Sequence, residues 1–415
     1  MVNRRTFMTL LATAAVAPDF SWAQGGGGSR VALYASVGPM LTHYDVDVAG
    51  AELSKRSSVM LPANIQYAWP HASRQYLYVA SSNSSPGLGG AVGDMHHVSA
   101  FRIDGSGALT PHGQPIPLPS RPIHLTTDIP SEYVLVAFNN PSALRVYRIN
   151  RDATLGEEVQ QPGPVDAGIF AHQVRVTDNN RLAILVTRGN DRVGEKPEDP
   201  GALKVFHFRN GLLTNTVSVA PNGGYGFGPR HLDFHPSKSW VYVSLERENK
   251  MDMFTLDGDT LSMAPLYRKE TLARPNNIVS RQAAGAVHVH PNGRFVYGAN
   301  RADTTTEFEG QKVFIGGENT IATYMINQET GEPTLIDHTE THGIHCRTFH
   351  VDPSGRLLVA AHIRPLLVRE GANVHQVPAC LSVFRIGNDG KLDFVRKYDV
   401  DVGNNTLFWM GMVKL

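Results

Sequence analysis

Residues 287–297, VHVHPNGRFVY, decide the fold of this chain, because the same phrase recurs along the sequence. It returns as LDFHPSKSWVYV at residues 232–243 and as FHVDPSGRLLV at residues 349–359. In each copy, a short alternating strand runs through a turn rich in Pro, Ser, Asn and Gly into an aliphatic-aromatic strand. Weaker copies lie at residues 74–79, 132–136 and 181–186.

The spacing of these copies predicts a propeller. A third alternating strand follows each copy, at residues 97–103, 144–149, 203–208, 251–256, 321–326 and 381–386. Steps of roughly 50 to 60 residues are typical of a four-stranded propeller blade. A partial copy at 31–53 lacks its first strand, which the C-terminal stretch 407–413 can supply. We therefore predict an all-β, seven-bladed β-propeller over residues 31–415, with its ring closed by strands from both termini.

Composition excludes several classes of protein. The 415 residues carry 38 basic and 38 acidic side chains, so the chain lacks the net charge with which nucleic-acid and anionic-membrane binders attract their partners. No apolar stretch is long enough to span a membrane. The two cysteines, Cys346 and Cys380, fall on the first and third strands of one blade. Such strands lie almost 10 Å apart, which is too far for a disulfide, so we expect both thiols to be buried and reduced.

The first 23 residues are typical of an export signal. Arg4 and Arg5 precede a short apolar run at 10–17, and Ser21-Trp22-Ala23 has the small residues of a cleavage site. Paired arginines predict export of the folded protein by the twin-arginine machinery. We expect a periplasmic or secreted protein with a flexible lead-in at 24–30.

Polar columns of the aligned strands indicate a site at one mouth of the central channel. Where the first strands begin, the aligned residues are Gln66, Ile123, His172, Arg230, Gly285 and Arg347. The second strands end on the same rim, at Asn83, Asn139, Arg188, Glu246, Asn300-Arg301 and His362. A single carboxylate among cations and imidazoles permits acid-base chemistry beside a stabilised negative charge. Long loops at 84–96, 189–201, 302–319 and 363–379 lie on this rim and predict a lidded pocket.

The stretch GPRHLDFHP at 228–236, together with Glu246 and AVHVHPNGR at 286–294, resembles the seven-bladed lactonase family. That family includes the propeller-type 6-phosphogluconolactonases and the fungal 3-carboxy-cis,cis-muconate lactonizing enzymes. The resemblance covers about residues 30–415 and implies catalytic roles for His172, Arg230 and Glu246, with His288 or Arg301 at a further basic position. The expected site comprises catalytic His172, Arg230, Glu246 and His288, with substrate contacts from Arg347, Arg301, His345 and His231.

These residues favour hydrolysis of a small sugar-acid or catabolic lactone. Arg230 and Arg347 would hold the lactone and stabilise the oxyanion, while Glu246 or His172 takes a proton from water. No Gly-x-Ser-x-Gly elbow is present to suggest a serine nucleophile. A phosphorylated cytosolic lactone would not meet an exported protein, so we expect a substrate outside the cytoplasm. We expect a monomer without a cofactor.

Other interpretations remain open at this point. A carboxymuconate-type cycloisomerase would use the same arginines, and a propeller can also be a binding platform without activity. Arg230 could belong to a structural ion pair, and His124 and His231 fit packing roles between blades. His342, His345 and His350, with His288, could in principle bind zinc or copper, but they lack a recognised ligand spacing, so we expect no metal.

Overall fold

Each copy of the repeated phrase forms the two inner strands of a blade. In the copy at 287–297, β22 (Ala283–Val289) pairs antiparallel with β23 (Phe295–Arg301), and Val289 is opposite Val296. Gly293 makes the turn between them at a φ of +70°, a conformation that side chains with a Cβ rarely adopt. The repeat therefore becomes a series of hairpins whose apolar positions face the neighbouring blades.

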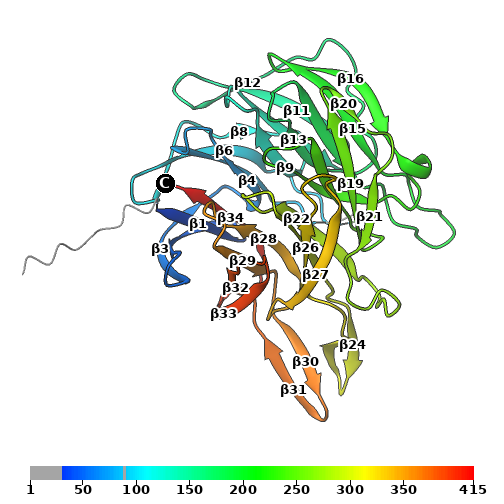
Figure 1. Ribbon diagram of the computed structural model, residues 1–415. Coiled ribbons are helices and arrows are strands. Elements are labelled where there is room, and N and C mark those ends of the chain that lie inside the picture. The colour runs from blue at the N-terminus through cyan, green and yellow to red at the C-terminus, as the bar shows by residue number, and fades with distance from the viewer. Residues whose placement is uncertain (1–29, 87–89) are drawn as a thin grey trace, which may run out of the picture.

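Seven such sheets form the ring in the computed structural model, which describes residues 30–86 and 90–415 (Figure 1). The innermost strands are β34 (Leu407–Lys414), β4 (Asn64–Pro70), β9 (Pro122–Thr127), β13 (Ala171–Val176), β17 (Pro229–Phe234), β22 and β28 (Cys346–Val351). The second strands are β1 (Val31–Val37), β5 (Tyr76–Ser82), β10 (Tyr133–Asn139), β14 (Leu182–Thr187), β18 (Trp240–Leu245), β23 and β29 (Leu357–His362). Each innermost strand contacts the next, so the ring is continuous.

The outer strands complete the blades. The third strands are β2 (Met40–Asp47), β6 (His96–Ile103), β11 (Ser142–Ile149), β15 (Ala202–Arg209), β19 (Lys250–Asp257), β26 (Thr320–Ile326) and β32 (Cys380–Ile386). The outermost are β3 (Glu52–Met60), β7 (Leu109–Pro111) with β8 (Ile116–Pro117), β12 (Leu155–Glu158), β16 (Leu212–Val219), β20 (Thr260–Leu261) with β21 (Tyr267–Glu270), β27 (Pro333–Glu340) and β33 (Leu392–Asp399). Within residues 30–86 and 90–415, the one helical element is a short 3₁₀ turn, η1 (Pro221–Gly224).

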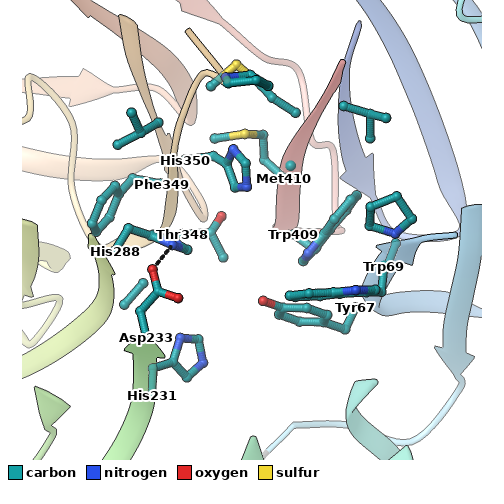
Figure 2. Close-up of a pocket in the computed structure, with 18 of the residues that line it drawn as sticks. Tyr67, Trp69, His231, Asp233, His288, Thr348, Phe349, His350, Trp409 and Met410 are labelled. Atoms are coloured by element: carbon teal, nitrogen blue, oxygen red, sulfur yellow. Dashed lines mark ion pairs between the residues drawn. The ribbon is translucent and has the colours of Figure 1, made fainter. Parts of the chain in front are cut away.

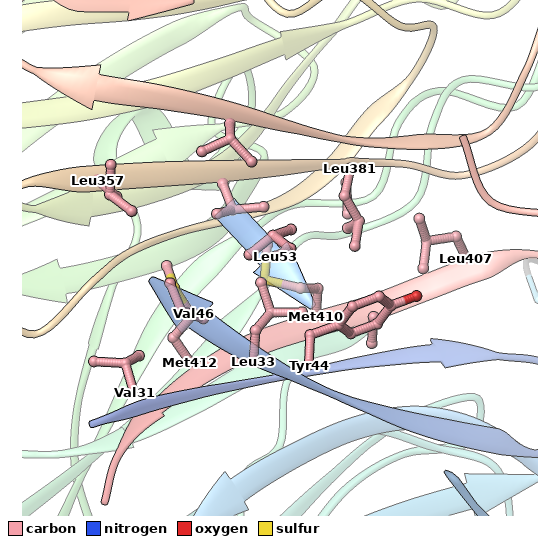
Figure 3. Close-up of a cluster of buried hydrophobic side chains, with 14 of the residues drawn as sticks. Val31, Leu33, Tyr44, Val46, Leu53, Leu357, Leu381, Leu407, Met410 and Met412 are labelled. Carbon is pink, nitrogen blue, oxygen red and sulfur yellow. The ribbon is translucent and has the colours of Figure 1, made fainter. Parts of the chain in front are cut away.

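Strands from the two ends of the described chain close the ring, as the partial copy predicts. β34 pairs antiparallel with β1, so Leu33 is opposite Met412. Leu33, Met410 and Met412 are buried against Leu357 and Leu381 of the last blade (Figure 3). Apolar burial of this kind stabilises the closure by about 25 cal/mol per Å² removed from water, and pairing removes two free sheet edges.

A β-bulge interrupts every innermost strand at the same level. In β17, Pro229 pairs with Leu245 and His231 with Ser244, which leaves Arg230 without a partner across the ladder. The equivalent bulge residues are Gln66, Ile123, His172, Gly285 with Ala286, Arg347, and Phe408 with Trp409. A bulge breaks the strict alternation of side chains, so consecutive residues such as Arg230 and His231 can both reach the channel.

Two of the four long loops are more ordered than the sequence indicates. The loops at 302–319 and 363–379 contain the hairpins β24 (Thr305–Phe308)–β25 (Gln311–Phe314) and β30 (Leu366–Glu370)–β31 (Asn373–Val377). β25 pairs parallel with β30, which joins the hairpins in an eighth sheet that projects from the ring (Figure 1). The pairing of segments about 50 residues apart is non-local, which explains why a repeat search does not find it.

Three further expectations concern the cysteines and the N-terminus. Cys346 and Cys380 are buried and form no disulfide, as the strand spacing predicts. The export signal at 1–23 and all but Arg30 of the lead-in at 24–30 lie outside the described residues. Within the described chain, no helix is long and apolar enough to cross a membrane.

Candidate active site

Glu246 is fixed at one mouth of the channel by the strand that precedes it. It follows the buried strand β18, and its backbone N–H donates to the carbonyl of Gly228 at 2.8 Å. Its own carbonyl accepts from the N–H of Ala284 at 3.1 Å, so the backbone is held between two blades. We call the hollow around its side chain the Glu246 cavity, which has a volume of about 730 Å³.

Three guanidinium groups surround the Glu246 carboxylate. Oε1 lies 3.3 Å from Nε of Arg230 and is also paired with Nη2 of Arg301, while Oε2 lies 3.2 Å from Nε of Arg188. The Arg230 side chain is only 1% exposed. These guanidiniums come from three blades, so the carboxylate offsets charges that would otherwise repel one another in a buried place.

The pKa values follow from burial and this crowding of charge. Burial alone would raise the pKa of Glu246, but Arg301, Arg188, Arg230 and Arg347 outweigh it and hold the value at about 2. Burial lowers the pKa of Arg230 to about 9, and Arg301 adds to the effect. At neutral pH, Glu246 is therefore ionised with a low proton affinity, which makes it a poor general base.

His172 lies in the same cavity but differs from Glu246 in being uncharged. It is the bulge residue of β13 and is 8% exposed, and its Nδ1 has no hydrogen-bond partner among the described residues. Burial, and then the charges of Arg230 and Arg347, hold its pKa well below the ordinary value. The imidazole is therefore neutral at neutral pH, with a nitrogen lone pair that can accept a proton.

Arg347 is a buried cation without a carboxylate partner in the described chain. Its guanidinium carbon lies 3.5 Å from the ring centroid of Phe408, and the residue is 7% exposed. Arg121 approaches the same ring at 5.8 Å and donates to the Gln66 side chain at 2.5 Å. Cation–π contact orients both guanidiniums without neutralising them. They remain available to an anion or an oxyanion in the cavity.

The rest of the cavity continues this excess of positive charge. His345 Nε2 lies 3.1 Å from Nη1 of Arg301, and its Nδ1 lies 3.0 Å from Asp303. The whole lining contains nine arginines against the three carboxylates Asp191, Glu246 and Asp303. Because the cations exceed the carboxylates, the cavity favours an anionic ligand or a transition state that develops negative charge.

The structure divides the residues predicted from the sequence between two places. His172, Arg230, Glu246, Arg301, His345 and Arg347 line the Glu246 cavity together. His288 and His231 instead line a second cavity farther along the channel. Of the two residues that the sequence leaves open for the further basic position, Arg301 lies beside the carboxylate and His288 lines the second cavity. Because Arg230 is the bulge residue of β17, Arg230 and His231 line different cavities although they are consecutive.

Sequence reasoning missed several residues of this cavity, among them Arg121 and Phe408. Arg121 precedes β9 in an Arg-Pro pair, and Phe408 is a bulge residue of the closing strand. Aligning 407–413 with the other first strands would have revealed Phe408, because it falls in the column of Arg230 and Arg347.

The histidines considered for metal binding fall in three places, with His288 and His350 as neighbours whose ring centroids lie 5.4 Å apart. His345 is in the Glu246 cavity, His350 lines the second cavity, and His342 stacks on Phe394 with ring centroids 3.7 Å apart. Among residues 30–86 and 90–415, no three His, Cys, Asp or Glu side chains are grouped as metal ligands.

Comparison with known proteins identifies the family of this chain. The profile of the family described as "Lactonase, 7-bladed beta-propeller" matches residues 31–368. The chain belongs to this lactonase family. A 6-phosphogluconolactonase of Bacillus subtilis (strain 168) is 27% identical over 330 residues, which cover 77% of this chain and 83% of that protein. A 6-phosphogluconolactonase of Pectobacterium carotovorum is 26% identical over 316 residues, or 75% and 82% of the two chains.

Solved structures share the lactonase-family fold. The periplasmic gluconolactonase PpgL of Pseudomonas aeruginosa matches with a TM-score of 0.67 and 20% identity, over 93% of this chain and 99% of that one. A protein from Lactobacillus plantarum matches with a TM-score of 0.69 and 20% identity, over 93% and 100%. The predictions of a seven-bladed propeller and of a lactonase-type enzyme are thereby confirmed at the level of the family.

Proposed function

We propose that this lactonase-family protein hydrolyses a small sugar-acid or catabolic lactone at the Glu246 cavity. The observation that carries the proposal is the meeting of a neutral imidazole, His172, with the buried guanidiniums of Arg230 and Arg347 in one cavity. Hydrolysis of a cyclic ester needs a proton acceptor for water and fixed positive charge for the carbonyl oxygen. The names of the relatives, 6-phosphogluconolactonase and gluconolactonase, support the same class of reaction.

In the first step, His172 accepts a proton from a water molecule while the water oxygen forms a bond to the lactone carbonyl carbon. The carbonyl π electrons move to oxygen, and the resulting oxyanion lies against Arg230 and Arg347. Fixed donors of this kind are worth about 10² to 10³ in rate each, because they need no reorganisation when the charge appears.

In the second step, the oxyanion reforms the carbonyl and the bond to the ring oxygen breaks. The imidazolium of His172 returns its proton to the departing alkoxide, which gives a hydroxy acid that ionises at neutral pH. Atoms and charges balance without a cofactor. The carboxylate product suits the excess of arginines in the lining.

Glu246 acts through the arginines in this scheme. Both of its oxygens are engaged, Oε1 by Arg230 and Arg301 and Oε2 by Arg188, and its pKa of about 2 disfavours proton uptake. It is therefore a positioning residue that keeps the Arg230 guanidinium facing the reacting oxygen and limits repulsion among the cations.

We also propose that the protein acts outside the cytoplasm as a monomer, after export by the twin-arginine machinery. The Arg4-Arg5 leader supports the route, and the name of the periplasmic neighbour supports the destination. Cell fractionation should recover activity in the periplasm or medium, and replacing both arginines by lysine should retain the protein inside the cell. Unchanged export of that variant would overturn the route.

A panel of small lactones, with a pH indicator to register acid release, tests the reaction. Saturable acid release from an aldonolactone is expected, and Arg230→Ala should abolish most of it. Ring closure of a carboxymuconate without lactone hydrolysis would make the protein a cycloisomerase. Inactivity on the whole panel, by folded protein, would contradict the proposal.

A further inference from the structure

The channel contains a second cavity beyond the bulges, toward the opposite mouth. We call it the Asp233 cavity; its volume is about 330 Å³, within the range of small-molecule sites. Six of the innermost strands, all except β9, contribute to its lining. His231 belongs to this lining, and its Nε2 lies 3.3 Å from Nη1 of Arg230, so the two cavities lie back to back.

One side of the Asp233 cavity is aromatic. Figure 2 shows Tyr67, Trp69 and Trp409 on one side of the open space, with Phe349 and His288 on the other. Trp409 is 4% exposed and Tyr67 lies 6.0 Å from it between ring centroids, so these walls are fixed by packing. Rigid aromatic faces present a flat apolar surface to a ring-shaped ligand.

The charges in this cavity cancel one another. Asp233 Oδ1 accepts from Arg175 at 3.0 Å, and its Oδ2 accepts from the backbone N–H of Val289 at 2.9 Å and lies 3.7 Å from Nδ1 of His288. Arg175 in turn covers the Trp69 ring at 5.0 Å. The Glu246 cavity has a large excess of arginine, whereas here one guanidinium faces one carboxylate. An anion gains little in such surroundings.

Two polar side chains in the cavity have no partner among the described residues. Thr348 is 5% exposed and lines the open space at its centre, yet its Oγ1 makes no hydrogen bond (Figure 2). His350 Nδ1 is likewise unpaired, and burial lowers the pKa of His350 to about 4, so the ring is neutral at neutral pH. Buried polar groups are nearly always paired, so each of these atoms can take a hydrogen bond with a ligand hydroxyl.

We propose that the Asp233 cavity is a second ligand site, which binds an uncharged, ring-shaped polyol the size of a monosaccharide. The apolar face of such a ring packs on Tyr67, Trp69 or Trp409. Its hydroxyls pair with Thr348 Oγ1, which can donate or accept, and with His350 Nδ1. This site is separate from the lactone site and does not depend on the reaction assigned to it.

Calorimetric titration of the whole protein with D-glucose, D-galactose and myo-inositol tests the proposal, with D-gluconate and indole as the anionic and apolar probes. Saturable binding of at least one neutral polyol is expected, with no comparable binding of indole. It should survive Arg230→Ala, which disables the Glu246 cavity. Intrinsic fluorescence should change on binding, because Trp69 and Trp409 line the site.

Thr348→Val keeps the shape of the side chain and removes its hydroxyl, so it should weaken polyol binding about fivefold, the value of one hydrogen bond. The melting temperature of Thr348→Val shows whether this variant folds. If it does not, a crystal of the unsubstituted protein soaked with the polyol locates the ligand. Binding that is lost in Arg230→Ala and kept in Thr348→Val would overturn the proposal. So would binding of indole alone, no saturable binding of any polyol, or electron density only in the Glu246 cavity.

Discussion

The two cavities of the channel share five innermost strands, β13, β17, β22, β28 and β34, and differ in charge. The Glu246 cavity gathers nine arginines around three carboxylates, whereas the Asp233 cavity pairs one arginine with one carboxylate between aromatic walls. The bulge in each innermost strand separates the two chemistries, since it directs Arg230 to one cavity and His231 to the other. Two consecutive residues of one strand, Arg230 and His231, therefore line two cavities of different charge in the same channel.

The largest expected effect is the loss of hydrolysis on removing Arg230. Arg230→Ala should lower kcat/KM on an aldonolactone by about 10² to 10³, because a fixed oxyanion donor is lost. Arg145→Ala, which removes a half-buried pair with Glu158 outside the cavity, is the matched control and should change the rate less than twofold. Equal effects of the two variants would show that the arginines of the cavity have no special role.

Glu246→Gln should destabilise the protein more than Asp233→Asn does. Glu246 offsets three guanidiniums, and removing its charge leaves Arg230 and Arg301 without a carboxylate partner while Arg188 keeps Asp191, at a cost of about 3–5 kcal/mol in the free energy of unfolding. Asp233 pairs with a single guanidinium and keeps a backbone N–H partner. Denaturant titration of both variants gives the order. A larger loss in Asp233→Asn would reverse the comparison.

The pH profile should report a base with a lowered pKa. Burial and the neighbouring arginines favour neutral His172, so the active form predominates above a pKa that lies below 6.5. We expect kcat/KM to be flat from pH 6.5 to 8 and to fall only as the pH drops through the pKa of His172. His172→Gln should remove this limb together with most of the activity. An acidic limb centred at or above pH 6.5 would argue against His172 as the base.

The smallest effect is expected from the Phe408 ring. Phe408→Leu keeps the apolar volume but removes the cation–π contact with Arg347, which is worth about 0.5–2 kcal/mol. The kcat should fall a few-fold while KM changes little, since Arg347 stays in the cavity but is less well oriented toward the oxyanion. Initial-rate kinetics separate the two constants. A rise in KM alone would limit the Arg347–Phe408 contact to substrate binding.

The sequence predicts the ring well because the repeat is local. Each copy specifies its own hairpin, and the missing first strand at 31–53 indicates closure by residues 407–413. The same alignment brings Glu246, Arg230 and His172 to one rim. The alignment could not show that His231 and His288 lie in a different cavity. It assumes strict alternation of side chains along each strand, and the bulge breaks that alternation.

The projecting sheet was beyond sequence reasoning for a different reason. The turns Glu309-Gly310 and Gly371-Ala372, between short alternating runs, were available as signals of two hairpins. Nothing local indicates that β25 would pair with β30, because that contact joins two blades. Phe408 was missed because the closing strand carries only part of the repeat.

The most direct test of the central claim is a crystal structure with the hydroxy acid product of the preferred lactone, such as D-gluconate, soaked at the pH of activity. The account predicts the product carboxylate in the Glu246 cavity, within hydrogen-bond distance of Arg230 or Arg347 and beside His172. A product that occupies only the Asp233 cavity, or that binds away from these arginines, would contradict it.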